Sequence, residues 1–383
     1  MDALEYQRAI ENVIYLCRSA INGVTADKGR VENMNLEQLY QAAYRHLLTG
    51  ITAMALEAAG IRDKAFIQAK GKAIRKVAMF DVERVAVLQA LEKAGIWYMP
   101  LKGSVLKGYY PRIGMRQMAD NDILYDVSRS SDVRTIMESL GFTTVMYVQN
   151  NYNHDHYDKE PVCNFEMHRA LFAPASGEAL FDYYLNVKDR LVKDEGNAYG
   201  YHFTDEDFYI YITAHEYKHY SGSGTGLRSI LDTYVFLKRF EDKLDWNYIA
   251  GEVEKLGITD FERQNRSLAM HLFSDEAITP EDEAMLLYII GSGTYGNRRN
   301  YVGNQIQKLG GGRKGKLIYL KNRIFLPMQS VESGYPFFYR HKFLLPVLCV
   351  WRIIKGLTIR RSMVISEFKA LMKYNAKNAP SSS

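Results

Sequence analysis

The stretch Pro100–Asp126, PLKGSVLKGYYPRIGMRQMADNDILYD, decides how this chain folds. The apolar residues 96–99 precede it, and because this run is short and bounded by glycine and proline, it predicts a buried strand. The strand ends before Gly103, where the missing Cβ allows close approach of the backbone to a ligand. A helix is expected to begin after Ser104, so that its first N–H groups could face an anion.

Two acids follow this turn, Asp120 and Asp122, in a segment that predicts a second strand. Side chains two residues apart on a strand point to one face, so the two carboxylates are expected side by side. Such like charges repel unless a cation lies between them, and hard divalent cations such as Mg²⁺ prefer oxygen ligands. A third acid, Glu166, lies in the strand predicted for residues 162–168, where it shares a face with His168.

Composition is that of an ordinary globular protein. The chain has 383 residues, 47% hydrophobic and 24% charged, which is enough for two or three domains. Its three cysteines are far apart and show no metal-ligand spacing, which fits a reducing compartment and excludes a zinc ribbon. The N-terminus lacks the apolar core of a secretory signal, and the longest apolar run near the C-terminus is too short to span a membrane. We therefore expect a cytoplasmic protein.

The net charge of +5 conceals an asymmetry. Between Lys308 and Arg361, twelve Lys and Arg residues accompany the single acid Glu332, so this segment carries +11 and the rest of the chain −6. A segment this basic favours an anionic partner, such as a triphosphate, nucleic acid or lipid head groups. A solvated basic tail around a C-terminal helix is equally compatible with the sequence.

Hydrophobic periodicity predicts an α+β protein, with a small mixed sheet between two mostly helical parts. Helical patterns cover residues 3–22, 36–59 and 63–93 at the N-terminal end, and helices return after the predicted strands. The four expected parts are an N-terminal helical unit (1–94), a core with the predicted sheet (95–203), a helical domain (204–300) and a basic C-terminal segment (301–383).

Within the core, a helix at 128–140 and a strand at 141–146 are predicted to follow the aspartates. Residues 147–161 are polar and rich in Asn, Tyr and His, which predicts an exposed hairpin or loop. The cluster His-Asp-His at 154–156 is therefore expected to consist of surface residues rather than of metal ligands.

The order of these features resembles the nucleotidyltransferase superfamily typified by DNA polymerase β. More narrowly, LKG with YP, R-x-M-x-D-x-D-I-L, F-E-M-H, H-x-x-K-H and L-R-x-x-x-D resemble the bacterial uncharacterised nucleotidyltransferase family, over residues 35–355. The late segment 335–356 also resembles the C-terminal end of that family. The chain departs from the superfamily in two ways: the gap from Gly103 to Asp120 is longer than usual, and the third acid is Glu rather than Asp.

The resemblance implies transfer of a nucleoside monophosphate from an NTP such as ATP to an acceptor, with release of pyrophosphate and dependence on Mg²⁺ or Mn²⁺. The acceptor, a small molecule, a protein or an RNA, is left open. The implied metal ligands and catalytic residues are Asp120, Asp122 and Glu166. The implied nucleotide-binding residues are Gly103, Ser104, Lys102, Lys107 and Arg116. The candidate contacts to acceptor or phosphate are His168, His215, Lys218 and His219.

A competing motif is His215-Glu216-x-x-His219, which fits H-E-x-x-H. On a helix, His residues at i and i+4 can bind one Zn²⁺ while the Glu acts on its water. The longer metzincin form is not satisfied because position 225 is Thr, so a later acid such as Asp232 would have to be the third ligand. The resemblance instead assigns this segment to a helix packed on the catalytic sheet. A zinc hydrolase, and a nucleotide-binding or scaffold protein without turnover, are the alternatives to a transferase.

Overall fold

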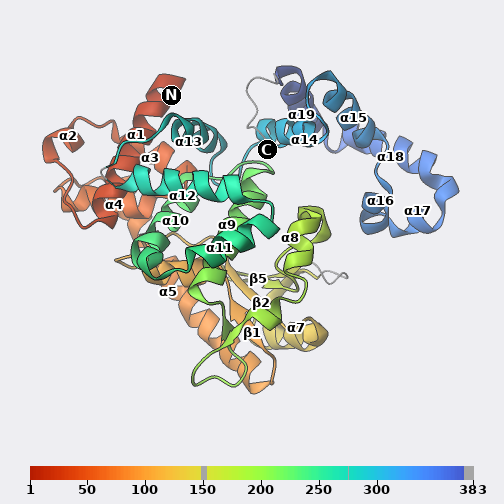
Figure 1. The fold of residues 1–383 in the computed structure, drawn as a ribbon, viewed down its shortest axis with the longest axis horizontal. Coiled ribbons are helices and arrows are strands. Elements are labelled where there is room, and N and C mark those ends of the chain that lie inside the picture. The colour runs from red at the N-terminus through yellow and green to blue at the C-terminus, as the bar shows by residue number, and fades with distance from the viewer. Residues whose placement is uncertain (148–152, 275, 375–383) are drawn as a thin grey trace. The chain divides into compact units, whose positions relative to one another are not determined.

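The computed structural model of the chain describes residues 1–147, 153–274 and 276–374. These residues form two compact units (Figure 1). Unit 1 comprises Met1–Lys218 and Leu227–Leu286, and unit 2 comprises His219–Gly226 and Leu287–Ser383. The expected division into four parts stays a prediction. Within the described residues, no helix combines the length and apolar character that crossing a membrane requires.

Unit 1 begins with helices, as the periodicity predicts for residues 3–22 and 63–93. They are α1 (Ala3–Ile21), α2 (Lys28–Glu32), α3 (Leu36–Arg45), α4 (Thr49–Ala58) and α5 (Lys64–Lys93). The prediction of one helix over 36–59 is wrong, because the chain turns at Leu47, which has a φ of 53°. This turn follows His46, a fully buried residue whose two ring nitrogens bond Tyr6 and the backbone N–H of Leu227.

A five-stranded mixed sheet follows, in the order β1-β2-β5-β4-β3. Its strands are β1 (Tyr98–Pro100), β2 (Asn121–Tyr125), β3 (Thr143–Met146), β4 (His154–Lys159) and β5 (Cys163–His168). Only β2 and β5 are parallel, and the three other pairs are antiparallel. The chain is therefore an α+β protein with a small mixed sheet, as expected.

The interpretation of residues 147–161 as an exposed hairpin or loop is only partly right. Residues 148–152 lie outside the described residues, but 154–159 form β4, which is an internal strand between β3 and β5. Alternation explains why a polar segment is accommodated there: Asp155 and Tyr157 are buried on one face, while His154 and His156 lie on the other.

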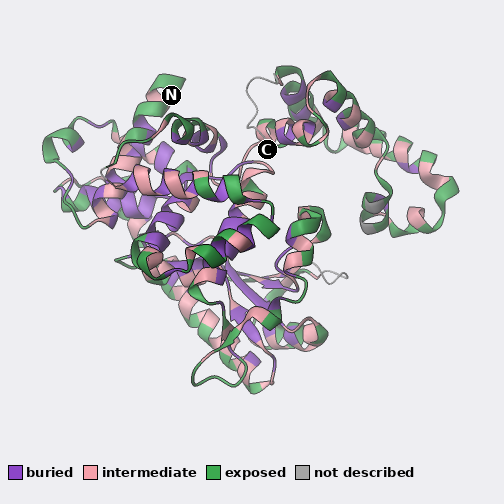
Figure 2. Cartoon of the chain, viewed as in Figure 1, coloured by how far each residue is buried: buried purple, intermediate pink, exposed green. Residues whose placement is uncertain are grey.

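Helices cover both faces of the sheet, and the buried residues follow the strands in Figure 2. On one face, Ile123 of β2 and Phe165 of β5 pack with side chains of α5 and α7 (Ser130–Ser139). On the other face, Leu124 belongs to the core built with α8 (Glu178–Tyr183), α9 (Asp205–Tyr220), α10 (Leu227–Phe240) and α11 (Trp246–Lys255). Because neighbouring residues on a strand face opposite ways, Asp122 and Glu166 lie on this second face.

The remaining elements of unit 1 connect and complete these layers. Thr204 caps α9, because its Oγ1 accepts the N–H of Asp207 at 3.1 Å. The remaining helices and strands are α6 (Gly103–Leu106), η1 (Lys107–Tyr109), η2 (Val127–Arg129), η3 (Pro174–Ser176), α8 (Glu178–Tyr183), η4 (Val187–Arg190), β6 (Val192–Lys193), β7 (Tyr201–His202), α9 (Asp205–Tyr220), α10 (Leu227–Phe240), η5 (Glu241–Lys243), α11 (Trp246–Lys255), α12 (Thr259–Phe273) and α13 (Pro280–Ser292).

Unit 2 is helical and has a small core. Its helices are α14 (Arg298–Lys308), α15 (Gly312–Ile324), α16 (Met328–Gly334), α17 (Pro336–Arg340), η6 (Lys342–Leu344), α18 (Leu345–Thr358) and α19 (Arg361–Lys373). Residues 310–312 form the tight turn that leads from α14 into α15, and all three are glycines with positive φ. The core cluster contains Val302, Ile306, Tyr319, Ala370 and Leu371.

Candidate active site

The three predicted acids meet on one face of the sheet. Asp122 of β2 and Glu166 of β5 are direct partners in the parallel pair, so their side chains project from neighbouring positions. Asp120 immediately precedes β2, and its carboxylate lies close enough to both other acids for their charges to act on it. The fold therefore brings together three carboxylates that are up to 46 positions apart in the sequence.

Two side chains, from Lys102 and His168, contact Asp122, the central one of the three acids. The Nζ atom of Lys102 lies 2.6 Å from Asp122 Oδ1, and the Nε2 atom of His168 lies 2.7 Å from the same oxygen. His168 Nε2 is also 3.6 Å from Glu166 Oε2, so the imidazole lies between the two acids. Asp122 is buried, with only 3% of its surface exposed, and these contacts compensate its charge.

The acids differ in how readily they bind protons. Burial and the neighbouring Asp122 carboxylate raise the pKa of Asp120 to about 6. Burial alone would also raise the pKa of Asp122, but the Lys102 ammonium and the hydrogen bond from His168 hold it well below its usual range. Burial opposes ionisation of Glu166 in the same way, and the contact with His168 lowers its pKa nevertheless. Glu166 and Asp122 are thus carboxylates at neutral pH, as metal ligands must be.

The glycine turn lies next to Asp122. Lys102 has a φ of 49°, a left-handed conformation that costs a residue with a Cβ roughly 1–3 kcal/mol, and such strain is often stored at functional sites. Ser104 closes this turn by two hydrogen bonds: its N–H and its hydroxyl both donate to the carbonyl of Leu101, at 3.2 and 2.6 Å.

Arg116 does not act as the free charge partner that we expect for a nucleotide. Its guanidinium is buried and forms a bidentate pair with Asp232 of α10, with both N···O distances 2.8 Å. It supports the turn instead: a Cβ on Gly103 would lie 2.3 Å from Arg116 Nη1, so only glycine fits against this guanidinium. The acid that holds this guanidinium is therefore not one of the three acids of the site.

Lys107 is also paired with an acid that is not one of the three acids of the site. Its Nζ atom lies 2.8 Å from Asp81 Oδ2 of α5, the helix that covers the opposite face of the sheet. Lys102 is therefore the base in contact with the acids, whereas Lys107 is paired with Asp81 and Arg116 reaches Asp120 only through its charge.

Helix α9 contributes Lys218 to the surroundings of the acids. Burial and the neighbouring Lys102 lower the pKa of Lys218, while the charges of Glu166 and Asp122 act against that shift. The two histidines on this helix differ: His215 is half-buried with its ring 6.2 Å from the Tyr211 ring, whereas His219 is exposed.

The geometry does not favour the zinc hydrolase. Glu216, the general base in that interpretation, points into the helical core, where Asn265 Nδ2 and Thr233 Oγ1 donate to its Oε2 at 3.1 and 3.4 Å. Burial raises the pKa of Glu216 to about 7. Asp232, considered as a third ligand, is the partner of Arg116.

Sequence reasoning missed His154. Among the described residues, His154, Glu166 and His168 are the group of metal-ligating side chains whose ligand atoms all lie within 4.8 Å of one another. The expectation that residues 154–156 are surface residues is wrong, since Asp155 is fully buried and bonded to Arg169 and Tyr125. The period-two alternation of His154, His156 and Asp158 was the available signal for a strand.

One comparison with known proteins identifies the family of this chain. A family model described as "Uncharacterised nucleotidyltransferase" matches residues 32–274, and the chain therefore belongs to that family. The matched region contains the acids and the glycine turn, whereas the segment 335–356 lies outside it. No curated protein and no solved structure matches the chain.

Proposed function

We propose that this member of the uncharacterised nucleotidyltransferase family transfers a nucleoside monophosphate from an NTP to an acceptor hydroxyl or phosphate. An oxygen of the acceptor attacks the α-phosphorus, the bond to the bridging oxygen breaks, and pyrophosphate leaves. The observation that carries this proposal is the parallel pairing of Asp122 with Glu166, with Asp120 next to them. This pairing gives an acidic cluster beside a glycine turn, as such a reaction requires.

The residues present fit a divalent cation. Asp122 already has the Lys102 ammonium and the His168 ring on one carboxylate oxygen, so this position attracts positive charge. Asp120, Asp122 and Glu166 would hold Mg²⁺ or Mn²⁺, which would neutralise the developing charge on the phosphate oxygens. Their oxygen-only chemistry suits these hard ions.

Lys102 is the base that we assign to the triphosphate. Its ammonium is paired at 2.6 Å with Asp122, a proposed metal ligand, and a cation bound to that carboxylate would release the ammonium to a phosphate oxygen. The charge of Lys218 interacts with the carboxylates of Glu166 and Asp122, and we assign this lysine to the acceptor or to a phosphate. Glu166, which is ionised at neutral pH, is the group that would accept the proton of an acceptor hydroxyl.

Label transfer tests the proposal directly. Purified protein is incubated with each α-labelled NTP, Mg²⁺ and a cell extract, in parallel with Asp120→Ala and with the exposed acid variant Glu160→Gln as control. We expect label on an acceptor with the native chain and with Glu160→Gln, but not with Asp120→Ala. Equal labelling by native protein and Asp120→Ala, or no labelling with any NTP, would contradict the proposal.

A further inference from the structure

We propose that His154, Glu166 and His168 form a binding site for a borderline divalent metal ion such as Zn²⁺ or Co²⁺. The inference rests on the proposed function in one respect, because it shares Glu166 with the acidic cluster. It adds two nitrogen ligands from β4 and β5, and with them a different class of metal.

The ligand atoms are already close to the spacing that a metal imposes. Glu166 Oε1 lies 3.4 Å from His154 Nε2, and Glu166 Oε2 lies 3.6 Å from His168 Nε2. A tetrahedral ion with bonds of about 2.0–2.1 Å separates its ligand atoms by about 3.3 Å. With one ligand atom from each residue, all three lie within 4.8 Å of one another, so movements of up to roughly 1.5 Å would bring them to this spacing.

Strand pairing fixes this arrangement. His154 and His168 are direct partners in the antiparallel pair of β4 with β5, and their ring centroids are 5.1 Å apart. Glu166 precedes His168 by two residues and so lies on the same face. Next to His154 in β4, Asp155 is fully buried and forms an ion pair of 2.9 Å with Arg169, which holds the register of the strand.

The donor set indicates which metals would bind. Imidazole nitrogen suits Zn²⁺, Co²⁺ and other transition metals, whereas Mg²⁺ prefers oxygen ligands alone. Two imidazoles and one carboxylate leave a further position open, and Asp122 Oδ1, 2.7 Å from His168 Nε2, is beside it. A transition metal is thus expected at the His154 end of the cluster, and Mg²⁺ at the Asp120 end.

The test measures binding of the metal itself. Full-length protein is titrated with Co²⁺, followed by its visible absorption, and with Zn²⁺, followed by calorimetry. His154→Gln should weaken the binding of both Co²⁺ and Zn²⁺ at least about tenfold. His202→Gln is the matched control, because His202 is exposed on β7 and bonds Asp194 at 2.6 Å; it should bind as the native chain does. Thermal melting shows that each variant is folded.

Two results would overturn the site: native affinity in His154→Gln, or loss of Zn²⁺ binding in His219→Gln, which would assign the ion to α9 instead.

The metal site and the proposed transferase activity fail separately. Co²⁺ binding that depends on His154, in a protein that labels no acceptor, would retain the metal site and remove the transferase. Labelling of an acceptor without Co²⁺ binding that depends on His154 would retain the transferase and remove the metal site.

A second, independent observation concerns unit 2, where the geometry points to a docking surface for an anionic lipid bilayer. Helix α18 and the residues just before it expose an apolar stripe at helical spacing. Val347, Val350, Ile354 and Leu357 are each more than half exposed. Trp351 lies on the same stripe and is 44% exposed, a residue type that favours membrane interfaces.

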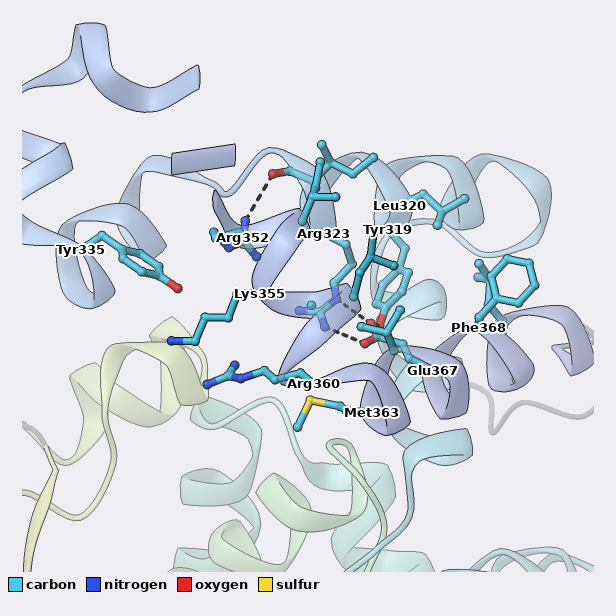
Figure 3. Close-up of a pocket in the computed structure, with 16 residues that line it drawn as sticks. Tyr319, Leu320, Arg323, Tyr335, Arg352, Lys355, Arg360, Met363, Glu367 and Phe368 are labelled. Atoms are coloured by element: carbon cyan, nitrogen blue, oxygen red, sulfur yellow. Dashed lines mark hydrogen bonds and ion pairs between the residues drawn. The ribbon is translucent and has the colours of Figure 1, made fainter. Parts of the chain in front are cut away.

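Charge identifies the occupant of this surface. The stripe belongs to the segment that carries +11, and a pocket of about 290 Å³ next to it combines apolar walls with basic side chains. In Figure 3, Lys355 and Arg360 extend toward the same side of this pocket as the Tyr335 hydroxyl, whereas Arg323 is paired with Glu367. A second copy of the chain would bring two basic segments together, and RNA would gain little from aliphatic side chains. Anionic head groups above acyl chains match both features.

Vesicle binding tests this surface. Full-length protein is sedimented with vesicles of phosphatidylcholine alone or mixed with phosphatidylglycerol. We expect binding to the anionic vesicles only, weakened at least about tenfold by Val350→Ser with Ile354→Ser. The control is Val82→Ser, a still more exposed valine on α5 of unit 1, and this variant should bind as the native chain does. Absence of binding to anionic vesicles, tighter binding to RNA, or a dimer that the double variant dissociates would each refute the inference.

Discussion

His168 Nε2 lies 2.7 Å from Asp122 Oδ1, so a histidine of β5 is bonded to the central acid of β2. This contact joins the two parallel strands on the face that also carries Glu166 and Asp120. It makes the acidic cluster a mixed site of carboxylates and imidazole.

Glu166→Gln should reduce Mg²⁺-dependent label transfer at least about 100-fold, because an amide supplies neither the charge nor the basicity of a carboxylate. Transfer rates with saturating NTP measure the effect. Glu160→Gln, an exposed change of the same kind in the turn between β4 and β5, is the control and should leave the rate unchanged. A Glu166→Gln enzyme with native rates would remove this residue from the chemistry.

Lys102→Ala should weaken NTP binding about tenfold or more, whereas Lys107→Ala should change it less than about twofold. The structural reason is that Lys102 contacts Asp122, while Lys107 is paired with Asp81 of α5. Titration with a fluorescent NTP analogue distinguishes the two lysines. Equal losses in both variants would show that the contacts of the structure do not predict the nucleotide site.

Gly103→Ala should destabilise the protein by about 1–3 kcal/mol, because the new Cβ would lie 2.3 Å from Arg116 Nη1. Gly108→Ala in η1 is the matched control, since a Cβ there meets nothing within 4 Å. Urea unfolding measures the two free energies of unfolding. Equal stability of both variants would mean that the guanidinium can move aside.

Arg116→Met should cost about 3–5 kcal/mol of stability, because it leaves the Asp232 carboxylate buried without its guanidinium partner. Arg116→Met with Asp232→Leu should recover part of this loss, since it removes the unpaired charge. Chemical unfolding of the single and double variants provides the measurement. If the single variant unfolds like the native chain, the pair does not stabilise the fold.

Glu216→Gln should make the protein more stable than the native chain at pH 8. The folded state raises the pKa of Glu216 from 4.5 to about 7, so it binds the proton more tightly than the unfolded state does. Native stability should therefore fall as pH rises from about 4.5 to 7, by up to about 3 kcal/mol, and Gln removes this loss.

The measurement is thermal or urea unfolding of native protein and Glu216→Gln across this pH range. Glu254→Gln, an exposed change on α11, should keep the native pH dependence. Parallel pH profiles for native and Glu216→Gln protein would show that Glu216 is not the titrating group.

The sequence by itself determined the local elements and the chemistry of the candidates. Period-two and helical patterns predicted β1, β2, β5 and the long helix α5, and the order of the glycine turn and the acids predicted the family. These features depend on near neighbours in the chain, so the sequence contains them directly.

Only the tertiary structure decided which side chains are available. Arg116 and Lys102 look alike in the sequence, but Asp232, 116 positions after Arg116, neutralises the first, and Asp122 bonds the second. His154 joins Glu166 because β4 is an internal strand, which a polar segment does not reveal. Burial and pairing between distant residues set which charges remain free to bind a ligand, and such pairings are determined by packing rather than by spacing along the chain.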